Sequence, residues 1–142
     1  MPQTDQEVVR SILTEIVNMD KIMAGKTRSD LEENLTLERA VSMTLGLIGE
    51  KANNISPKFI DKHPEIEWRK IIALRNRIVH SYEDLDFDII YDTVVRKLPE
   101  LKEQLHGALD APKKTQLLEK KPSSNLLPKK SVRKGNGRNL KP

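Results

Sequence analysis

The sequence contains no cysteine and few aromatic residues. Among its 142 residues there are no Cys, one Trp, two Tyr and two Phe. The lack of cysteine excludes a disulfide framework, a thiolate metal site and a cysteine nucleophile. The three histidines do not fall at the i, i+4 spacing that a helical metal site needs. We therefore expect an aliphatic core and chemistry that uses neither a metal nor another cofactor.

The sequence also has no long apolar run. Its N-terminus, MPQTDQEVVR, lacks the basic-then-apolar order of a signal peptide. No stretch approaches the roughly 18 consecutive apolar residues of a membrane span. We expect a protein of the cytoplasm that makes no membrane contact.

Charge divides the chain into two segments. Residues 1–109 carry 15 Lys and Arg against 19 Asp and Glu, a net charge of −4, whereas residues 110–142 carry 10 against 2, a net charge of +8. The second segment is rich in Pro, Ser, Asn and Gly and has no sustained apolar period. We interpret 110–142 as a disordered basic tail that either serves solubility or holds RNA loosely through phosphate contacts.

Within residues 1–109 the apolar residues recur at intervals of three and four, which is typical of helices. Thr4, Thr36 and Ser56 are expected N-caps, and Gly25 is an expected helix stop. No stretch alternates as a strand would. The pattern predicts an all-α antiparallel bundle of about four principal helices plus a short helix. The principal helices are expected near residues 5–24, 37–55, 65–80 and 86–105, and the short one near 57–63.

Three residues inside these helices are unusual. Gly46 and Gly49 lie within the second long helix, where glycine costs about 1 kcal/mol relative to alanine. We therefore expect another helix to approach closely at that level. Pro99 lies within the last helix and is expected to kink or divide it.

The helix EWRKIIALRNRIVHSY carries polar groups close to its apolar side. At about 100° per residue, Arg75 falls in the middle of the apolar arc, and Asn76 and His80 lie side by side at its edge. An arginine in this position needs an anionic partner. From the spacing alone, Arg75 is either one half of an internal ion pair, with Glu50 as a candidate partner, or part of a functional site.

The arrangement Arg75-x4-His80-x-Tyr82 resembles the R-x4-H-x-Y signature of HEPN-domain proteins, in particular HepT-like toxins of toxin–antitoxin pairs. The flanking sequences LIGEKANNIS (47–56), HPEIEWRKIIALRNRIVHSY (63–82) and LPELKEQL (98–105) are also similar to that family. The resemblance covers roughly residues 5–108. It implies a helical bundle that forms a homodimer.

The resemblance further implies the toxin of a type VII-like pair, a metal-independent endoribonuclease that cleaves RNA. It assigns catalysis to Arg75 and His80 and a supporting role to Asn76. Glu50 is a candidate to orient Arg75, or else a simple salt bridge of the bundle. Tyr82 would accept AMP from a minimal nucleotidyltransferase, the cognate antitoxin; otherwise Tyr82 caps or packs the helix. The alternative function is a non-catalytic adaptor or nucleotide-binding partner of such a transferase.

Overall fold

The fold is all-α. The computed structural model describes the backbone of residues 3–80, 84 and 86–118, and their side chains as far as residue 110. No strand occurs among these residues, as the sequence predicts. In chain order the elements are α1 (Asp5–Met23), α2 (Arg28–Glu33), α3 (Leu35–Ala52), α4 (Pro57–Lys62), α5 (Trp68–His80), α6 (Phe87–Asp92), the π-helix η2 (Thr93–Lys97) and α7 (Leu98–Leu118).

The first helix begins and ends where the sequence predicts. Thr4 caps α1: its side-chain hydroxyl accepts a hydrogen bond from the Glu7 N–H, and the Glu7 carboxylate accepts one from the Thr4 N–H. This reciprocal pair satisfies two backbone donors that the helix leaves free. Gly25 follows the helix with φ of +72°, a left-handed conformation that favours glycine.

The second long helix begins earlier than expected. The cap is Asn34 and not Thr36, because the Asn34 side chain accepts the Leu37 N–H at 3.0 Å and so starts α3 at Leu35. The helix also ends at Ala52, short of the expected residue 55. Ser56 caps the short helix α4, and Pro57 occupies its first position, as predicted.

The helix that carries the motif starts three residues later than expected. Pro64 and Glu65 form a turn, in which the Ile66 N–H donates to the His63 carbonyl, and α5 begins at Trp68. The Trp68 side chain is buried and anchors this end of the helix. α5 is described as far as His80, and the residues that follow, 81–83, lie outside the described residues.

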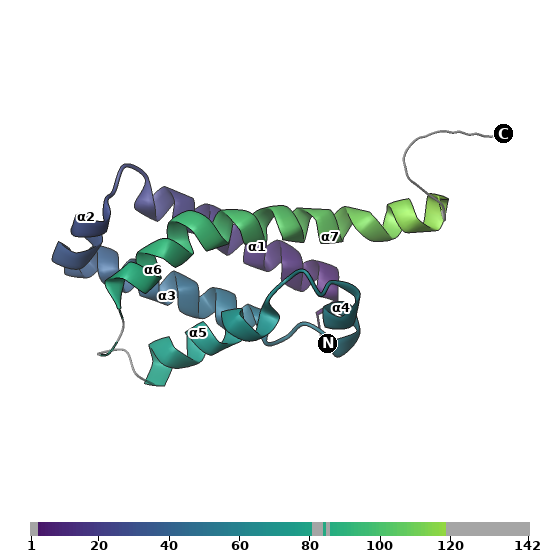
Figure 1. Cartoon of the computed structure of the whole chain (residues 1–142), viewed down its shortest axis with the longest axis horizontal. Helices are drawn as coiled ribbons and strands as arrows, with labels where there is room; N and C mark the ends of the chain where they lie inside the picture. The colour runs from purple at the N-terminus through teal and green to yellow at the C-terminus, as the bar shows by residue number, and fades with distance from the viewer. Residues whose placement is uncertain (1–2, 81–83, 85, 119–142) are drawn as a thin grey trace. The chain divides into compact units, whose positions relative to one another are not determined.

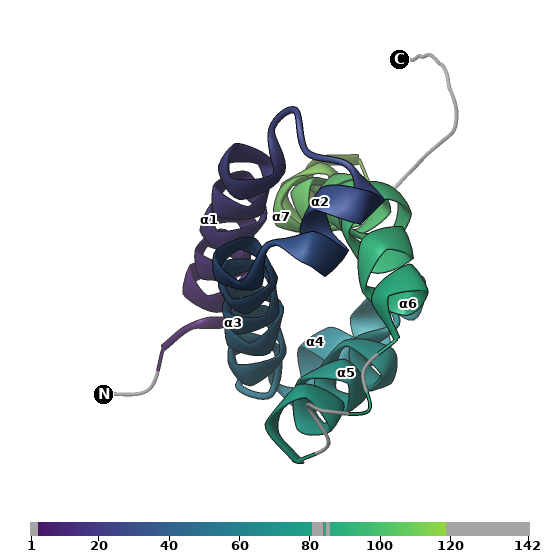
Figure 2. The same cartoon turned by 90° about the vertical axis from the view of Figure 1, so that its left-hand side faces the viewer.

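α3 packs against α1 on one side and α5 on the other (Figures 1 and 2). The Asp5 carboxylate at the start of α1 accepts hydrogen bonds from Ser56, which follows the end of α3. These two helices are therefore antiparallel. α3 and α5 are antiparallel as well, because Gly49 faces Arg75 whereas Gly46 faces Ile78.

The core is aliphatic, as the composition predicts. Its largest fully buried side chains come from α1, α2, α3, α6 and α7 and are Val8, Val9, Ile12, Ile16, Met19, Leu31, Val41, Ile48, Ile90 and Leu105. Within the part of the chain that the structure describes, no helix is both long and apolar enough to cross a membrane.

A π-helical turn precedes Pro99. The Leu98 N–H donates to Thr93 O, five residues back, within an otherwise continuous helical run from Phe87 to Leu118. Proline has no N–H to donate to Val95 O, and its ring clashes with that carbonyl in a regular α-helix. The wider turn accommodates the ring, so the expected division at Pro99 takes the form of a π-helix.

The chain separates into two compact units, residues 1–106 and 107–142. Helix α7 continues to Leu118, past residue 110, where the sequence places the start of the disordered tail. The predicted tail, residues 110–142, therefore begins within α7, and its residues 119–142 lie outside the described residues. Its separation from the bundle stays a prediction.

Candidate active site

The site is built where α3 and α5 approach most closely. A Cβ added at Gly49 would collide with the Arg75 Cβ and would lie 3.0 Å from the Ile71 carbonyl oxygen. Only glycine leaves room for α5 at this point. The expectation of close helix approach is therefore confirmed at Gly49. At Gly46 the nearest atom is Ile78 Cγ2, at 4.0 Å, which is ordinary contact.

Arg75 lies over Gly49 and is held by two oxygens. Its Nη2 lies 2.7 Å from Glu50 Oε1 on α3, and its Nη1 donates to Asn76 Oδ1 at 3.0 Å. The structure thus provides the anionic partner that the sequence requires. The pair is not deeply buried, since the side chains of Arg75 and Glu50 are 32% and 55% exposed. Arg75 therefore presents a fixed guanidinium to solvent.

His80 and Tyr82 are not joined to this cluster. His80 is the exposed last residue of α5, about 7.5 Å further along the helix axis than Arg75. Among the described residues the His80 side chain has no hydrogen bond or ion pair. Tyr82, the expected AMP acceptor, lies outside the described residues. The structure therefore brings together Glu50, Arg75 and Asn76, and places His80 outside the residues that line the groove, next to Val79, which does line it.

The groove between α3 and α5 has a volume of about 600 Å³ and an apolar floor. Met43, Leu47 and Val79 are 65%, 39% and 54% exposed. Sequence reasoning did not assign Met43 to this surface, although its four-residue spacing from Leu47 on α3 is a signal that was available. The groove is lined by Arg39, Ser42, Met43, Gly46, Leu47, Glu50, Arg75, Ile78 and Val79.

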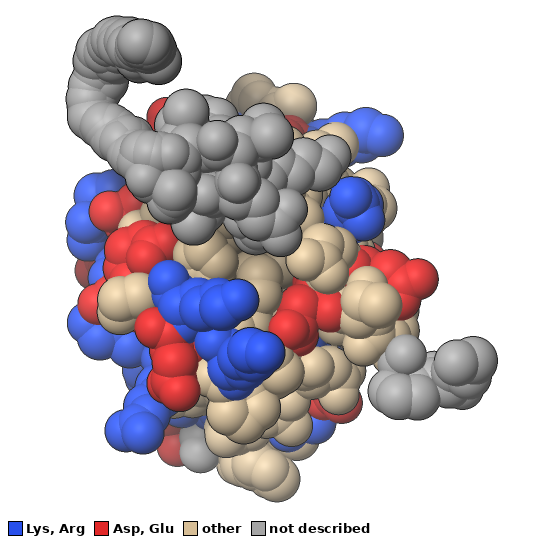
Figure 3. Space-filling model, turned by 90° about the vertical axis from the view of Figure 1, so that its right-hand side faces the viewer, with Lys and Arg blue, Asp and Glu red and all other residues tan. Residues whose placement is uncertain are grey.

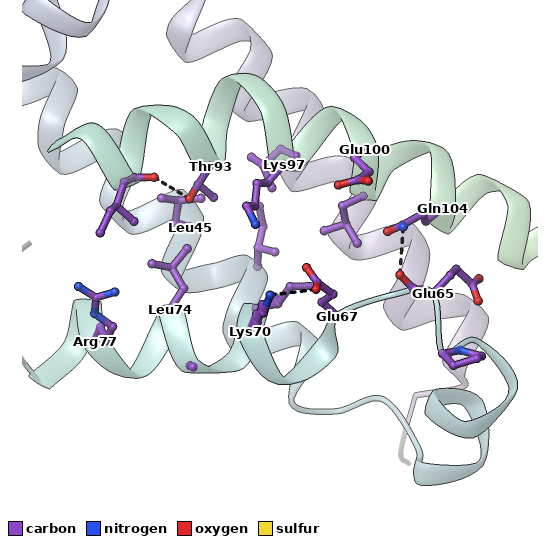
Figure 4. A pocket seen from close by; sticks show the side chains of 17 residues that line it. Leu45, Glu65, Glu67, Lys70, Leu74, Arg77, Thr93, Lys97, Glu100 and Gln104 are labelled. Carbon is purple, nitrogen blue, oxygen red and sulfur yellow. Dashed lines mark hydrogen bonds and ion pairs between the residues drawn. The ribbon is translucent and has the colours of Figure 1, made fainter. Parts of the chain in front are cut away.

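A second hollow, of about 590 Å³, lies between α5 and the helices η2 and α7 (Figure 4). Lys70 bonds to Glu67 there, and Gln104 donates to the Glu65 carbonyl. The Lys70 ammonium, with a smaller contribution from Lys97, lowers the pKa of the Glu67 carboxyl. Neither Arg75 nor His80 lines this hollow. The candidate active site is therefore the α3–α5 groove.

The described surface carries charges of both signs and no evident metal site. Lys and Arg lie beside Asp and Glu on the face shown in Figure 3. Among the residues that the structure describes, no group of three or more His, Asp or Glu side chains is placed to hold a metal ion.

The arrangement suits an anionic ligand. A guanidinium has five N–H donors in a planar fork, and Glu50 and Asn76 each engage one nitrogen of Arg75. The donors that remain can bind phosphate oxygens in pairs. His80, which follows the groove residue Val79 on α5, carries an imidazole, a side chain that can serve as a general acid or base. This surface of the helical bundle can therefore bind an anion through Arg75, with a histidine on the same helix.

Comparison with known proteins identifies the family. Residues 12–107 match the model of the family described as Ribonuclease HepT-like. The chain belongs to this HepT-like, HEPN-type ribonuclease family, as the motif predicts.

Curated relatives of the chain come from bacteria and archaea. "Putative RNase TTE0752" of Caldanaerobacter subterraneus subsp. tengcongensis is 28% identical over 111 residues, which cover 78% of this chain and 99% of the relative. "Putative RNase MJ0127" of Methanocaldococcus jannaschii is 33% identical over 103 residues, 70% of this chain and 83% of the relative. "Probable ribonuclease HepT" of Thermococcus cleftensis is 38% identical over 63 residues, 44% and 57% of the two chains. No solved structure matches the chain significantly.

Proposed function

We propose that the protein is the ribonuclease toxin of a type VII-like toxin–antitoxin pair and that it cleaves RNA in the cytoplasm without a metal ion. Membership of the HepT-like ribonuclease family supports RNA as the substrate. The observation that carries the proposal is the Arg75 guanidinium, fixed by Glu50 and Asn76 at the surface of a groove. Arg75 and His80 are the proposed catalytic residues, with Asn76 and Glu50 in support.

Metal-free cleavage of RNA needs three chemical roles. A base removes the proton of the ribose 2′-hydroxyl, whose oxygen then attacks the phosphorus. The bond from phosphorus to the 5′ oxygen breaks, and an acid protonates that oxygen, which leaves a 2′,3′-cyclic phosphate and a 5′-hydroxyl. Histidine can act as the base or the acid, and arginine stabilises the charge on the phosphorane.

We further propose that the active form is a homodimer in which two motifs face each other. On a helix, Arg75 and His80 point about 140° apart, so one motif does not clamp one phosphate. The apolar side chains of Met43, Leu47 and Val79 are exposed beside Arg75. A second copy of the chain placed over this face would cover them and bring a second Arg75 and His80 to the site.

Neutralisation is proposed to act through Tyr82. A minimal nucleotidyltransferase, the cognate antitoxin, would transfer AMP from ATP to the Tyr82 hydroxyl and release pyrophosphate. The added phosphate would lie two residues from His80 and would repel the RNA backbone.

Growth arrest tests the proposed toxin. The wild-type chain and the variants Arg75→Ala and His80→Ala are induced in separate cultures that contain no partner gene, and their expression levels are compared. We expect only the wild type to stop growth, because each variant lacks one of the catalytic groups. Harmless wild-type protein, or equal toxicity of all three chains, would favour a non-catalytic adaptor of a transferase.

A further inference from the structure

We infer that Glu50 is a positioning residue with two separable effects: its oxygen fixes the Arg75 guanidinium, and its negative charge limits how tightly the groove holds an RNA phosphate. This inference rests on the proposed function, since it concerns the same site. Glu50 would then lower the affinity for RNA and raise the rate of cleavage.

The positioning effect follows from the contacts around Arg75. The stem of Arg75 lies against Gly49, and its guanidinium meets Glu50 Oε1 from α3 and Asn76 Oδ1 from its own helix. The stem and both outer nitrogens are thereby held from two different helices. A long side chain that is 32% exposed would otherwise sample several rotamers. Losing the Glu50 oxygen leaves only the neighbouring Asn76 to orient the charge.

The second effect follows from electrostatics. A phosphate bound to the free edge of Arg75 shares that guanidinium with the Glu50 carboxylate, so two anions lie close to one cation. Like charges at this separation repel, and the repulsion is moderated by water because the Glu50 side chain is 55% exposed. The carboxylate therefore weakens phosphate binding while it orients the group that binds.

Two substitutions separate the effects. Glu50→Gln retains a carbonyl oxygen for Arg75 and removes the charge, whereas Glu50→Ala removes both. Steady-state cleavage of a fluorescently labelled single-stranded RNA gives kcat and KM for each variant. Binding of the same RNA is measured by fluorescence anisotropy in a His80→Ala background, which is expected not to cleave.

We expect Glu50→Gln to tighten RNA binding about fivefold, with a smaller change in kcat. We expect Glu50→Ala to lower kcat at least tenfold, because a guanidinium that is not held in place stabilises the negative charge of the phosphorane less well. The kcat of the glutamine variant should therefore exceed that of the alanine variant. If the salt bridge had only a structural role, both substitutions would break it and lower kcat to the same extent.

Glu33→Gln is the matched control. It changes the net charge by the same amount at an exposed position on α2, next to the start of α3, whereas Glu50 lies near the end of that helix. The control is expected to bind RNA like the parent protein. Circular dichroism and size-exclusion chromatography confirm that each variant folds and assembles like its parent.

Two results would overturn the inference: unchanged RNA affinity in the Glu50→Gln, His80→Ala protein, or equal loss of kcat in Glu50→Gln and Glu50→Ala. The anisotropy arm does not require catalysis. If the wild type fails to cleave any RNA, the proposed function fails, while unchanged affinity in the anisotropy arm counts against Glu50 alone.

Discussion

Arg75 shows how far single residues can be predicted from the sequence. Its place in the apolar arc of α5 predicts an anionic partner, and Glu50 lies 2.7 Å away. The exposure of Arg75 could not be predicted in the same way. The helical arc shows which residues share the apolar side of α5, but it does not show which part of that side another helix covers. The side chain of Val79, on the same helix, is 54% exposed. The arginine therefore faces a groove and not the core.

Tyr82 provides a test of neutralisation at the residue scale. Tyr82→Phe removes only the hydroxyl that would accept AMP. We expect the variant to cleave RNA like the wild type and to remain toxic when the cognate nucleotidyltransferase and ATP are present. Mass spectrometry of the wild-type chain from the same cells should show the mass of one added AMP group. Loss of toxicity in Tyr82→Phe without the partner would instead place the hydroxyl in the cleavage site.

At the scale of elements, the contact between α3 and α5 depends on Gly49. In Gly49→Ala the new Cβ collides with Arg75 Cβ, so α5 must shift and its packing weakens. We expect the free energy of unfolding to fall by about 2 kcal/mol. Gly46→Ala is the matched control, because its Cβ meets only Ile78 Cγ2 at 4.0 Å. Alanine there should leave stability unchanged or raise it by up to about 1 kcal/mol.

Chemical denaturation of both variants measures this difference. Equal stability of Gly49→Ala and Gly46→Ala would contradict the close approach of the helices. Cleavage should fall in Gly49→Ala as well, since the shift displaces Arg75 from Glu50.

The starts of α1 and α4 follow their predicted caps, whereas the starts of α3 and α5 were not predicted correctly. Thr4 and Ser56 each have an accessible backbone N–H three residues on, and both cap as expected. For α3 the sequence analysis expected Thr36, but the cap is Asn34, which also follows the end of α2. The π-helix at Thr93–Lys97 could not be predicted in detail, since proline signals only that a regular turn must change.

At the scale of the whole molecule, the proposed homodimer depends on the exposed apolar face beside Arg75. Val79→Asp places a charge there, and across a two-fold axis it would face an identical charge. We expect the dissociation constant of the dimer to rise at least tenfold and RNA cleavage to fall with it. Val95→Asp is the control, because Val95 is 49% exposed on η2 and lines neither the groove nor the second hollow.

Analytical ultracentrifugation measures the dissociation constants of the wild type and both variants. A wild-type monomer, or equal weakening by the two substitutions, would contradict a dimer through this face.

The all-α fold and the family could be predicted from the sequence, because helical periodicity and the motif with its flanks extend over most of residues 5–108. The groove could not, because it depends on which apolar side chains remain uncovered after packing. Leu47 belongs to the apolar face of its helix in the sequence, yet its side chain is 39% exposed, and Met43 on the same helix is 65% exposed.

Cleavage of RNA by the purified protein in the presence of EDTA tests the central claim most directly. The wild type should produce fragments with 5′-hydroxyl ends, and His80→Ala should reduce the rate at least a hundredfold while it remains a folded dimer. Cleavage that requires an added metal ion, or full activity in His80→Ala, would contradict the assignment of this groove as a metal-independent ribonuclease site.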